Sequence, residues 1–536
     1  MKDPMRGLRR SLAMIVLMAA LLHGCALKEY AGPGTDVSAR YRPMPELPQR
    51  LPSNEPVSVF GAATEFQGSP LAEVGYQALF AVHPAASTEI AILPNGDVSF
   101  AARMQMLEAA HTSIRIQALI FAGDEAGLKI AEVLKSKKAA GLDVRVIVDA
   151  VSNLDLQTQW MYFDLKQHGI EVQGYESLYL QWLNEIPLPP LLASLRDPEA
   201  PNHRYHEKMW IIDGETTDRR AVVGGLNIAN AYFRIDQTEP DGNWRDQDIV
   251  VKGALVADMV TAFDRNFAHF RDIKKSRGIF NTDIYWEATR DALETLGKMT
   301  VPYQTDAERV ARVNNLAMTK PDLHFVKARS RFFHNRPRLG ETYLPQAYAK
   351  LFAHARQEIL ICNAYFIPAQ EVIDAIRNAV NRGLQVRILT NSPETNDLPE
   401  MSMVGRSYYS EILALNNTDE ARQSGGRVQI WEWHGKRFGR IRQTQGTIHA
   451  KYAVFDRQYA LVGSYNLDPR SEKLNSETAV VFESGTLASE LARVFYENDL
   501  AFSRLVTPRE AAEFKDPTDA IYKLRKEFGD IFAPLL

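Results

Sequence analysis

Two short segments of this chain each combine a histidine, a lysine and an aspartate in one spacing, H-x-K-x₄-D. They consist of His206, Lys208 and Asp213 in the first segment, and of His449, Lys451 and Asp456 in the second. Side chains two positions apart on a strand leave the same face, so each histidine and its lysine can converge on one small anion. The aspartate, at an odd offset, is expected to point away from that face and to hold the end of the strand.

Two histidines and two lysines brought together would form a site for a phosphodiester. One neutral imidazole can attack phosphorus while the second, protonated, gives its proton to the leaving alcohol. The lysines can neutralise the charge that builds on the non-bridging oxygens, so the scheme uses no metal ion or other cofactor. Because the imidazoles must start in different protonation states, the activity is expected to be bell-shaped in pH.

Further polar residues follow each motif at matching positions. Each imidazole needs an acceptor on its second nitrogen, and the downstream candidates are Asp246, with Asp248 as its competitor, and Glu477. A G-[GS]-x-N tetrad lies between the motif and this carboxylate in both halves, and it is expected to offer donors to the phosphate. The predicted phosphate-binding residues from the tetrads are Gly225, Asn227, Ser464 and Asn466.

The surrounding elements repeat as well. The sequence pattern predicts a helix over 101–111, a strand over 113–121, a helix over 126–140 and a strand over 142–148. The same order recurs as 345–355, 359–362, 371–381 and 383–389. Strand, helix and strand in this rhythm indicate parallel pairing in an α/β layer. The duplication predicts two α/β/α domains packed as a pseudo-twofold pair with one shared active site.

The predicted domain boundaries follow from this repeat. They are a signal segment at 1–24, a tether and lead-in at 25–97, a first domain at 98–274, a surface connector at 275–340 and a second domain with a C-terminal helix at 341–536. Within the connector, 332–337 is interpreted as a loop. The helix expected near 520–528 should dock on the second domain.

The first residues have the pattern of an export signal. Lys2, Arg6, Arg9 and Arg10 precede the short apolar run 12–22, and Cys25 follows it. The pattern resembles a bacterial lipoprotein signal in which Cys25 becomes the lipid anchor. It predicts an exported, membrane-anchored protein on the periplasmic side, and Ala26 favours the outer membrane by the same resemblance. The only other cysteine, Cys362, lies in an apolar run and is expected to be buried.

With both complete motifs, the chain resembles the phospholipase D superfamily over residues 98–505. Asn466-Leu467-Asp468-Pro469-Arg470-Ser471 and Thr390-Asn391-Ser392 with Thr395-Asn396-Asp397 are similar to bacterial cardiolipin synthases of the type named C. The resemblance implies a phosphatidyltransferase or phospholipase D with a phosphohistidine intermediate and no obligatory metal. It also implies His206 as the nucleophile and the six motif residues, with Asp246 and Glu477, as the catalytic set.

Two other functions compete with this interpretation: a secreted nuclease of the same superfamily, and a non-catalytic, membrane-anchored binding protein. The net charge of −4 and the pI near 6.3 give no overall attraction to nucleic acid. The apolar stretch 175–195 and the aromatic, basic stretch 431–442 precede the two motifs and could contact a lipid surface. Phospholipids and an alcohol or water acceptor are therefore the expected partners.

Overall fold

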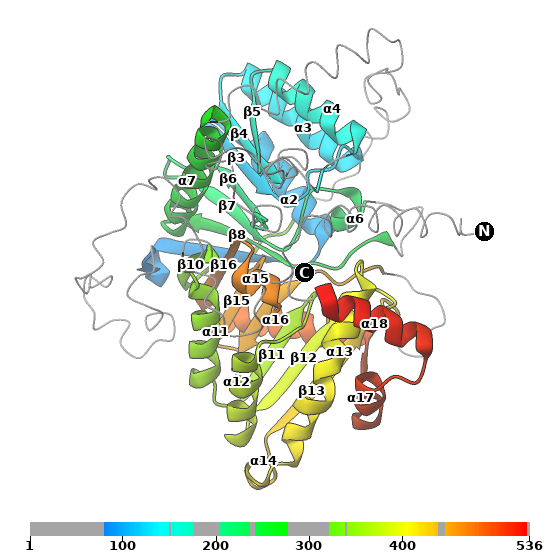
Figure 1. Ribbon diagram of the computed structural model, residues 1–536. Helices are drawn as coiled ribbons and strands as arrows, with labels where there is room; N and C mark the ends of the chain where they lie inside the picture. Colours follow the sequence, from blue (N-terminus) through cyan, green and yellow to red (C-terminus); the bar gives the residue numbers. More distant parts are fainter. Residues whose placement is uncertain are drawn as a thin grey trace.

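The computed structural model of the protein describes residues 80–149, 152–153, 155–175, 204–235, 242–276, 321–337, 340–437 and 445–532. They form two α/β halves, each built on its own mixed β-sheet (Figure 1). Within these ranges, no helix combines the length and the apolar character needed to cross a bilayer. The predicted signal segment and tether up to residue 79, and the apolar stretch from 176 onward, lie outside the described residues.

The first sheet has eight strands in the order β5-β4-β3-β6-β7-β8-β2-β9. β3, β4 and β5 are parallel, and the sheet continues from β3 by antiparallel pairing. The bounds are β2 (Thr88–Leu93), β3 (Ser113–Ala118), β4 (Asp143–Asp149), β5 (Glu171–Tyr175), β6 (Met209–Ile212), β7 (Arg220–Gly224), β8 (Asp248–Gly253) and β9 (Val326–Lys327).

The helices of the first half begin at side chains that cap them. Asn95, Asp124 and Asp155 accept bonds from the first-turn amides of α2, α3 and α4. These three helices pack their apolar residues on the outer face of the sheet. The helices are α2 (Gly96–Glu108), α3 (Glu125–Ala139), α4 (Leu156–Gln167), α6 (Asn230–Phe233) and α7 (Leu255–Ser276).

The second sheet has nine strands in the order β1-β10-β16-β15-β14-β11-β12-β13-β17. Its bounds are β1 (Val82–His83), β10 (Arg329–Asn335), β11 (Glu358–Asn363), β12 (Gln385–Asn391), β13 (Arg427–Trp433), β14 (Lys451–Phe455), β15 (Tyr459–Gly463), β16 (Glu477–Glu483) and β17 (Ser503–Leu505). The helices are α11 (Tyr343–His354), α12 (Gln370–Asn381), α13 (Pro399–Ala414), α14 (Asp419–Ser424), α15 (Pro469–Lys473), α16 (Gly485–Arg493), α17 (Pro508–Lys515) and α18 (Ala520–Phe532).

The predicted duplication is confirmed in the strand pairing. β3 pairs in parallel with β4 and antiparallel with β6, and β6, β7 and β8 follow in order. In the second half β11 pairs with β12 and β14, and β14, β15 and β16 follow in the same way. The fold is therefore the predicted pair of duplicated α/β domains.

The two motif strands are buried on both faces, which explains their apolar composition. In β6, Met209 and Ile211 join a core cluster shared by both sheets, whereas Trp210 and Ile212 face the helices of the first half. In β14, Tyr452 and Val454 face the shared cluster, and the alternate residues face the helices of the second half. The shared core also takes residues from α7 and α16, so the halves pack sheet to sheet through one apolar interior.

The structure corrects the predicted boundaries. β2 lies inside the predicted lead-in, yet it is a strand of the first sheet. The predicted connector contributes β9 to the first sheet and β10 to the second, where β10 pairs with β16 along its whole length. The loop predicted at 332–337 is therefore largely strand, and this part of the connector is buried rather than superficial.

The reason for this error is visible in the side chains of β10. Its sequence mixes charged and apolar residues, so it does not resemble a core strand. The structure satisfies the polar groups inside the protein: Arg331 donates to the carbonyl oxygen of Phe80 at 3.0 Å, and His334 Nε2 lies 2.8 Å from Glu207. Buried polar residues with such partners are tolerated in a strand.

Two smaller predictions are confirmed. Cys362 is a free, fully buried residue of β11. The C-terminal helix α18 packs on α13, where Arg525 bonds Glu400 at 2.6 Å and a Cβ at Gly529 would lie 2.9 Å from the Val404 side chain. Part of the basic stretch, 438–444, lies outside the described residues.

Candidate active site

The two motif histidines meet where the halves join. The ring centroids of His206 and His449 are 6.5 Å apart, and each residue lies just before the motif strand of its own half. This separation agrees with the prediction of one shared site, because two imidazoles at this distance can bond one phosphate from opposite sides. Both histidines are buried, with exposed fractions of 7% and 4%.

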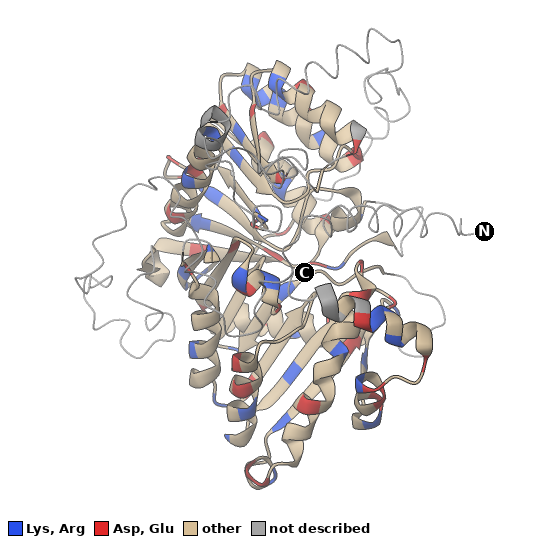
Figure 2. Cartoon of the chain, in the orientation of Figure 1, with Lys and Arg blue, Asp and Glu red and all other residues tan. Residues whose placement is uncertain are grey.

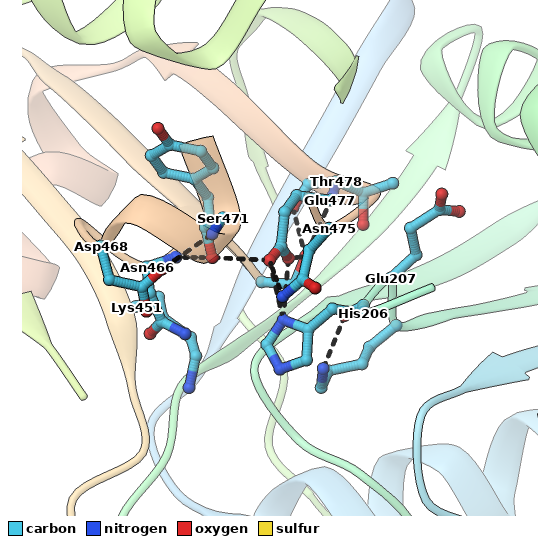
Figure 3. Close-up of polar contacts among 12 residues, drawn as sticks. His206, Glu207, Lys451, Asn466, Asp468, Ser471, Asn475, Glu477 and Thr478 are labelled. Atoms are coloured by element: carbon cyan, nitrogen blue, oxygen red, sulfur yellow. Dashed lines mark hydrogen bonds and ion pairs between the residues drawn. The ribbon is translucent and has the colours of Figure 1, made fainter. Parts of the chain in front are cut away.

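Each imidazole is held by a carboxylate from the other half. His206 Nδ1 lies 2.9 Å from Glu477 Oε2 (Figure 3). His449 Nδ1 lies 2.7 Å from Asp246 Oδ2. The sequence order had placed each carboxylate downstream of the histidine in its own half. The structure therefore confirms the two acceptors, but each one bonds the histidine of the other half instead of the histidine of its own half. The competitor, Asp248, instead binds Arg103 at 2.7 Å.

Backbone bonds explain the crossing. His206 donates its amide to the carbonyl of Ser476, and Ser476 donates to the carbonyl of Arg204. In the same way Arg245 donates to Thr447, and His449 donates to Arg245. The residue before each acceptor thus pairs with the lead-in of the opposite motif, which brings the acceptor to the opposite histidine.

The carboxylates leave one ring nitrogen of each histidine for chemistry. A carboxylate at Nδ1 favours the tautomer that carries the proton there, so Nε2 has the free lone pair. Burial lowers the pKa of His206 to about 4, with Glu477 opposing this effect and Lys208 adding to it. Burial and the two lysines lower the pKa of His449 well below its ordinary value. The neutral form of both imidazoles is therefore favoured at pH 7.

The two acceptors differ electrostatically. Burial would raise the pKa of Glu477, but His206, Lys208 and Ser464 outweigh it, so the pKa lies below its ordinary value. Ser471 donates its hydroxyl to this carboxylate at 2.7 Å (Figure 3), and Ser464 donates its hydroxyl at 2.5 Å. Burial raises the pKa of Asp246 despite the opposing charge of Lys451.

The two lysines lie side by side with the imidazoles and are fully buried. Lys208 Nζ donates to the carbonyl oxygen of His206 at 2.6 Å, and Lys451 makes the equivalent bond to His449. Burial lowers the pKa of Lys208 to about 7 and that of Lys451 to about 8, although nearby carboxylates oppose the shift. An anionic phosphate in the site would restore their charge, so the lysines are suited to hold it.

The tetrad residues serve the acceptors more than the phosphate. A Cβ on Gly225 would lie 2.1 Å from Asp246 Oδ1, so only glycine leaves room for this carboxylate. Ser464 bonds Glu477, as described above. Asn227 accepts from the amide of Ile120 and donates to the hydroxyl of Tyr232, so its amide is already engaged. Asn466 Oδ1 is buried without a partner among the described residues, but an amide oxygen only accepts, so this atom does not provide the predicted donor to phosphate.

Asp213 and Asp456 do not reach the imidazoles. Each lies at the far end of its motif strand with a positive φ, of 52° and 54°, and accepts several backbone N–H groups from the segment before β3 or β11. This is the strand-end role expected from their odd spacing. The prediction that Asp213 and Asp456 belong to the catalytic set is therefore wrong, and both are structural residues.

Several residues of the site lack a motif and were missed. The rings of Tyr232 and Trp244 pack against His449, with centroids at 5.2 and 5.4 Å. Trp244 lies two residues before Asp246, so spacing could have found it; Tyr232 has no comparable signal. Among the described residues, no group of three or more His, Cys, Asp or Glu side chains is arranged to hold a metal ion.

Comparison with known proteins places this geometry in a family. The family described as "Cardiolipin synthase, PLD-like domain" matches residues 104–267 and 348–499. A cardiolipin synthase of Halalkalibacterium halodurans is 26% identical over 414 residues, which are 77% of this chain and 66% of the relative. Cardiolipin synthase C of Escherichia coli is 26% identical over 409 residues, which are 75% of this chain and 82% of the relative.

A solved structure shares the fold. The crystal structure of phosphatidylserine synthase from Haemophilus influenzae aligns with a TM-score of 0.57 at 17% sequence identity. The alignment covers 85% of this chain and 97% of that one. The paired α/β halves are therefore an architecture already seen in a crystal.

Proposed function

The chain belongs to the phospholipase D superfamily, in the family described as cardiolipin synthase, PLD-like domain, and from this premise we propose that it transfers a phosphatidyl group to the alcohol of a second lipid. The observation that carries the proposal is the pair of imidazoles 6.5 Å apart, each backed by a carboxylate from the other half. The relatives named cardiolipin synthase support a cardiolipin synthase-like reaction.

The proposed reaction has two steps. In the first, Nε2 of His206 attacks phosphorus, a P–N bond forms, and the P–O bond to the leaving alcohol breaks. His449, protonated at Nε2, gives its proton to the leaving oxygen. In the second, His449 takes the proton of the incoming alcohol, whose oxygen attacks phosphorus and releases His206. Lys208 and Lys451 hold the non-bridging oxygens in both steps.

The acceptors support this division of roles. The intermediate carries a lasting positive charge on the phosphorylated imidazole, which needs an ionised partner. Glu477 is kept ionised by its hydroxyl donors and nearby cations, so it suits His206. Burial and the lysines lower the pKa of both imidazoles; the negative charge of a bound phosphodiester acts against this shift, so His449 takes up the proton that it donates when the substrate binds.

Lipid is the proposed substrate rather than nucleic acid. A nuclease is expected to present a long basic groove, whereas this chain has a net charge of −4. In the view of Figure 2, cations and anions are interspersed over both halves. We also propose that Cys25 carries a lipid anchor on the periplasmic side. Replacing it, Cys25→Ala, should release the protein from the membrane fraction, and continued membrane association would contradict the anchor.

Purified protein incubated with labelled phosphatidylglycerol and phosphatidylethanolamine tests the assignment directly. Chromatography of the products should show labelled cardiolipin or phosphatidic acid and the released head group. The His449→Asn variant serves as the inactive control. Faster cleavage of DNA than of either lipid would replace the assignment with that of a nuclease.

A further inference from the structure

The C-terminal helix α18 exposes two apolar side chains that the fold does not use. Among the described residues, Ile521 and Leu524 are the most exposed large apolar side chains, with exposed fractions of 71% and 67%. The next, Leu505 of β17, is exposed by only 37%. Exposed apolar residues are usually scattered singly. Ile521 and Leu524 are instead three positions apart on one helix, so they form a pair on the same side of it.

A different side of α18 attaches the helix to the protein. Arg406 of α13 donates to the hydroxyl of Tyr522 at 3.4 Å, and Arg525 donates to Glu400 at 2.6 Å. A Cβ on Gly529 would lie 3.1 Å from the carbonyl oxygen of Glu400. The helix therefore lies antiparallel on α13 (Figure 1), and the exposed apolar pair is on neither end of these contacts.

The sequence of α18 has the period of a helix that lies in an interface. Apolar residues recur at positions 521, 524, 528 and 531, which is the spacing of one helical side. The helix also carries three cations and two carboxylates, so the phosphates of a lipid surface do not repel it. An amphipathic helix binds a membrane by laying its apolar side at the boundary between head groups and acyl chains.

The attached part of α18 is connected to the catalytic segment of the second half. It lies over the first turns of α13, where Ser402 donates to the carbonyl of Asn391 at 3.1 Å. The side chain of Asn391 accepts from the amide of Ile448 at 3.0 Å and donates to its carbonyl at 2.7 Å. Ile448 directly precedes His449. A surface that binds α18 is thus joined through α13 to the segment that carries this imidazole.

A bilayer fits the apolar side of α18 better than a second folded protein does. A stable protein interface buries about 800 Å² on each partner. A helix of 13 residues is only about 20 Å long, and the exposed apolar pair covers a small part of that length. A folded partner must also match the shape of these side chains, whereas fluid lipid closes around each of them.

We propose that α18 is the surface by which the folded part of the protein rests on a lipid bilayer, with Ile521 and Leu524 entering the head-group region. The inference rests on the proposed function, because a lipid substrate has to reach His449 from a membrane. Docking of α18 turns the second half, and with it the His449 side of the active site, toward the lipid.

This contact is weak and reversible. The two aliphatic side chains hold fewer carbons than one myristoyl chain, which by itself binds a membrane only reversibly. Docking by α18 therefore orients a protein that the proposed anchor at Cys25 keeps at the membrane. It does not hold the protein in a washed membrane fraction after Cys25→Ala.

A fluorophore on α18 tests the docking directly. The full chain with Leu524→Cys is labelled with nitrobenzoxadiazole and placed on vesicles of phosphatidylcholine and phosphatidylglycerol, with or without doxyl-labelled phosphatidylcholine. The unsubstituted protein, labelled in parallel, gives the background from Cys25 and from the buried Cys362. Glu420→Cys, at an exposed position of α14, is the matched control.

Vesicles should shift the emission at position 524 to shorter wavelength, and the doxyl lipid should quench it. The control at position 420 should show neither effect. Absence of quenching at position 524 would overturn the proposal. A short-wavelength emission without vesicles would also overturn it: if it rises with protein concentration, a second copy covers α18, and if it does not, another segment of this chain does.

A pair of substitutions tests whether docking serves turnover. Ile521→Ser with Leu524→Ser should lower turnover of phosphatidylglycerol in vesicles about tenfold, because less apolar area leaves water on docking. Turnover of the soluble bis-p-nitrophenyl phosphate should not change. Lys523→Ser with Glu527→Ser alters two exposed residues of the same helix without changing its net charge, and should leave both activities in place. Equal losses on vesicles in the two double variants would count against the apolar pair.

The two proposals fail in different ways. If the intact protein turns over lipid but position 524 is not quenched, the docking helix is wrong and the proposed function stands. If position 524 is quenched but the protein cleaves only bis-p-nitrophenyl phosphate and no lipid, the helix docks and the proposed function fails.

Discussion

At the scale of single residues, the two histidines are equivalent in sequence but not in surroundings. His206 faces an ionised glutamate with two hydroxyl donors, whereas His449 lies between aromatic rings and an aspartate whose pKa burial raises. A duplicated motif therefore need not perform a duplicated role. The roles can be separated because a nucleophile and a proton donor fail at different steps.

Replacing the histidines one at a time should show this difference. His206→Asn should abolish turnover without forming any phosphorylated protein, because the attacking nitrogen is gone. His449→Asn should also stop turnover of a lipid, yet accumulate phosphoenzyme from phosphatidyl-p-nitrophenol, whose leaving group needs no proton. Acid-labile phosphate bound to protein is the measurement. Equal amounts of phosphoenzyme in both variants would contradict the division of roles.

The lysines should control the pH dependence. The histidine pair must carry one proton, and Lys208 and Lys451 act with burial to lower the pKa values of both imidazoles. Above those values the required proton is lost, so kcat/KM should fall as the pH rises. Lys208→Met removes one repelling charge, which raises the imidazole pKa values and should move the optimum of kcat/KM to higher pH while lowering its height.

A pH series of kcat/KM on bis-p-nitrophenyl phosphate measures this shift. Lys327→Met, which changes an exposed lysine of β9, is the control and should leave the optimum in place. A shift of the Lys208→Met optimum to lower pH would show that the lysines do not depress the imidazole pKa values.

At the scale of elements, each motif strand is held at both ends. Its start is tied to the opposite half through the crossed backbone bonds, and its end is tied to the neighbouring strand by Asp213 or Asp456. Within one motif, the histidine lies at the start of the strand and belongs to the active site, whereas the aspartate lies at the end of the strand and has a structural role. This arrangement explains why the spacing between them is the same in both halves.

The two aspartates should differ in their effect on stability. Asp213 is buried, with an exposed fraction of 6%, and besides the amides of the exposed His111 and Thr112 it accepts the amide of the buried Ser113. Asp213→Ala leaves this buried amide unpaired and should lower the free energy of unfolding by about 1–3 kcal/mol. Asp456 bonds the amides of Arg356 and Gln357, which are exposed and can turn to water. Asp456→Ala should therefore cost only about 1 kcal/mol.

Urea unfolding followed by circular dichroism measures both values. Asp218→Ala, at an exposed position of the turn after β6, is the matched control and should change the midpoint little. If Asp213→Ala abolished activity without lowering stability, the aspartate would belong to the chemistry after all.

At the scale of the whole molecule, the halves share both a core and a buried ion pair. Arg245 of the first half makes two bonds to Asp499 of the second, at 2.7 and 3.1 Å, and Tyr452 donates to the same carboxylate at 2.6 Å. Arg245 directly precedes Asp246, the acceptor of His449. The junction that holds the halves together is thus continuous with the active site.

Breaking this ion pair should weaken both properties. Asp499→Ala leaves the buried charge of Arg245 unpaired, and removal of one partner of a buried pair costs about 3–5 kcal/mol. The midpoint of urea unfolding should fall accordingly, and turnover should fall because Asp246 shifts. The double variant Arg245→Met with Asp499→Leu leaves no unpaired charge and should recover most of the stability. If the double variant were no more stable than Asp499→Ala, the charge would not be the cause.

The sequence by itself determined what depends on local order. Hydrophobic periodicity predicted the repeated strand and helix order, and the spacing of His206, Lys208, His449 and Lys451 predicted the phosphodiester chemistry. The odd offset of the aspartates even predicted their strand-end role. Such features are set by residues close together in the chain, where side-chain direction follows from the position along a strand.

Only the tertiary structure decided which half supplies the carboxylate acceptor for each histidine. Three features join residues that lie far apart in the chain. Glu477 bonds His206, β1 and β10 pair within the second sheet, and the rings of Tyr232 and Trp244 pack against His449. A duplicated sequence is compatible with acceptors inside each half or between the halves, because the same hydrogen bonds can form in both arrangements. The choice depends on how the two sheets pack face to face, and that packing is a sum of many buried contacts that no single segment specifies.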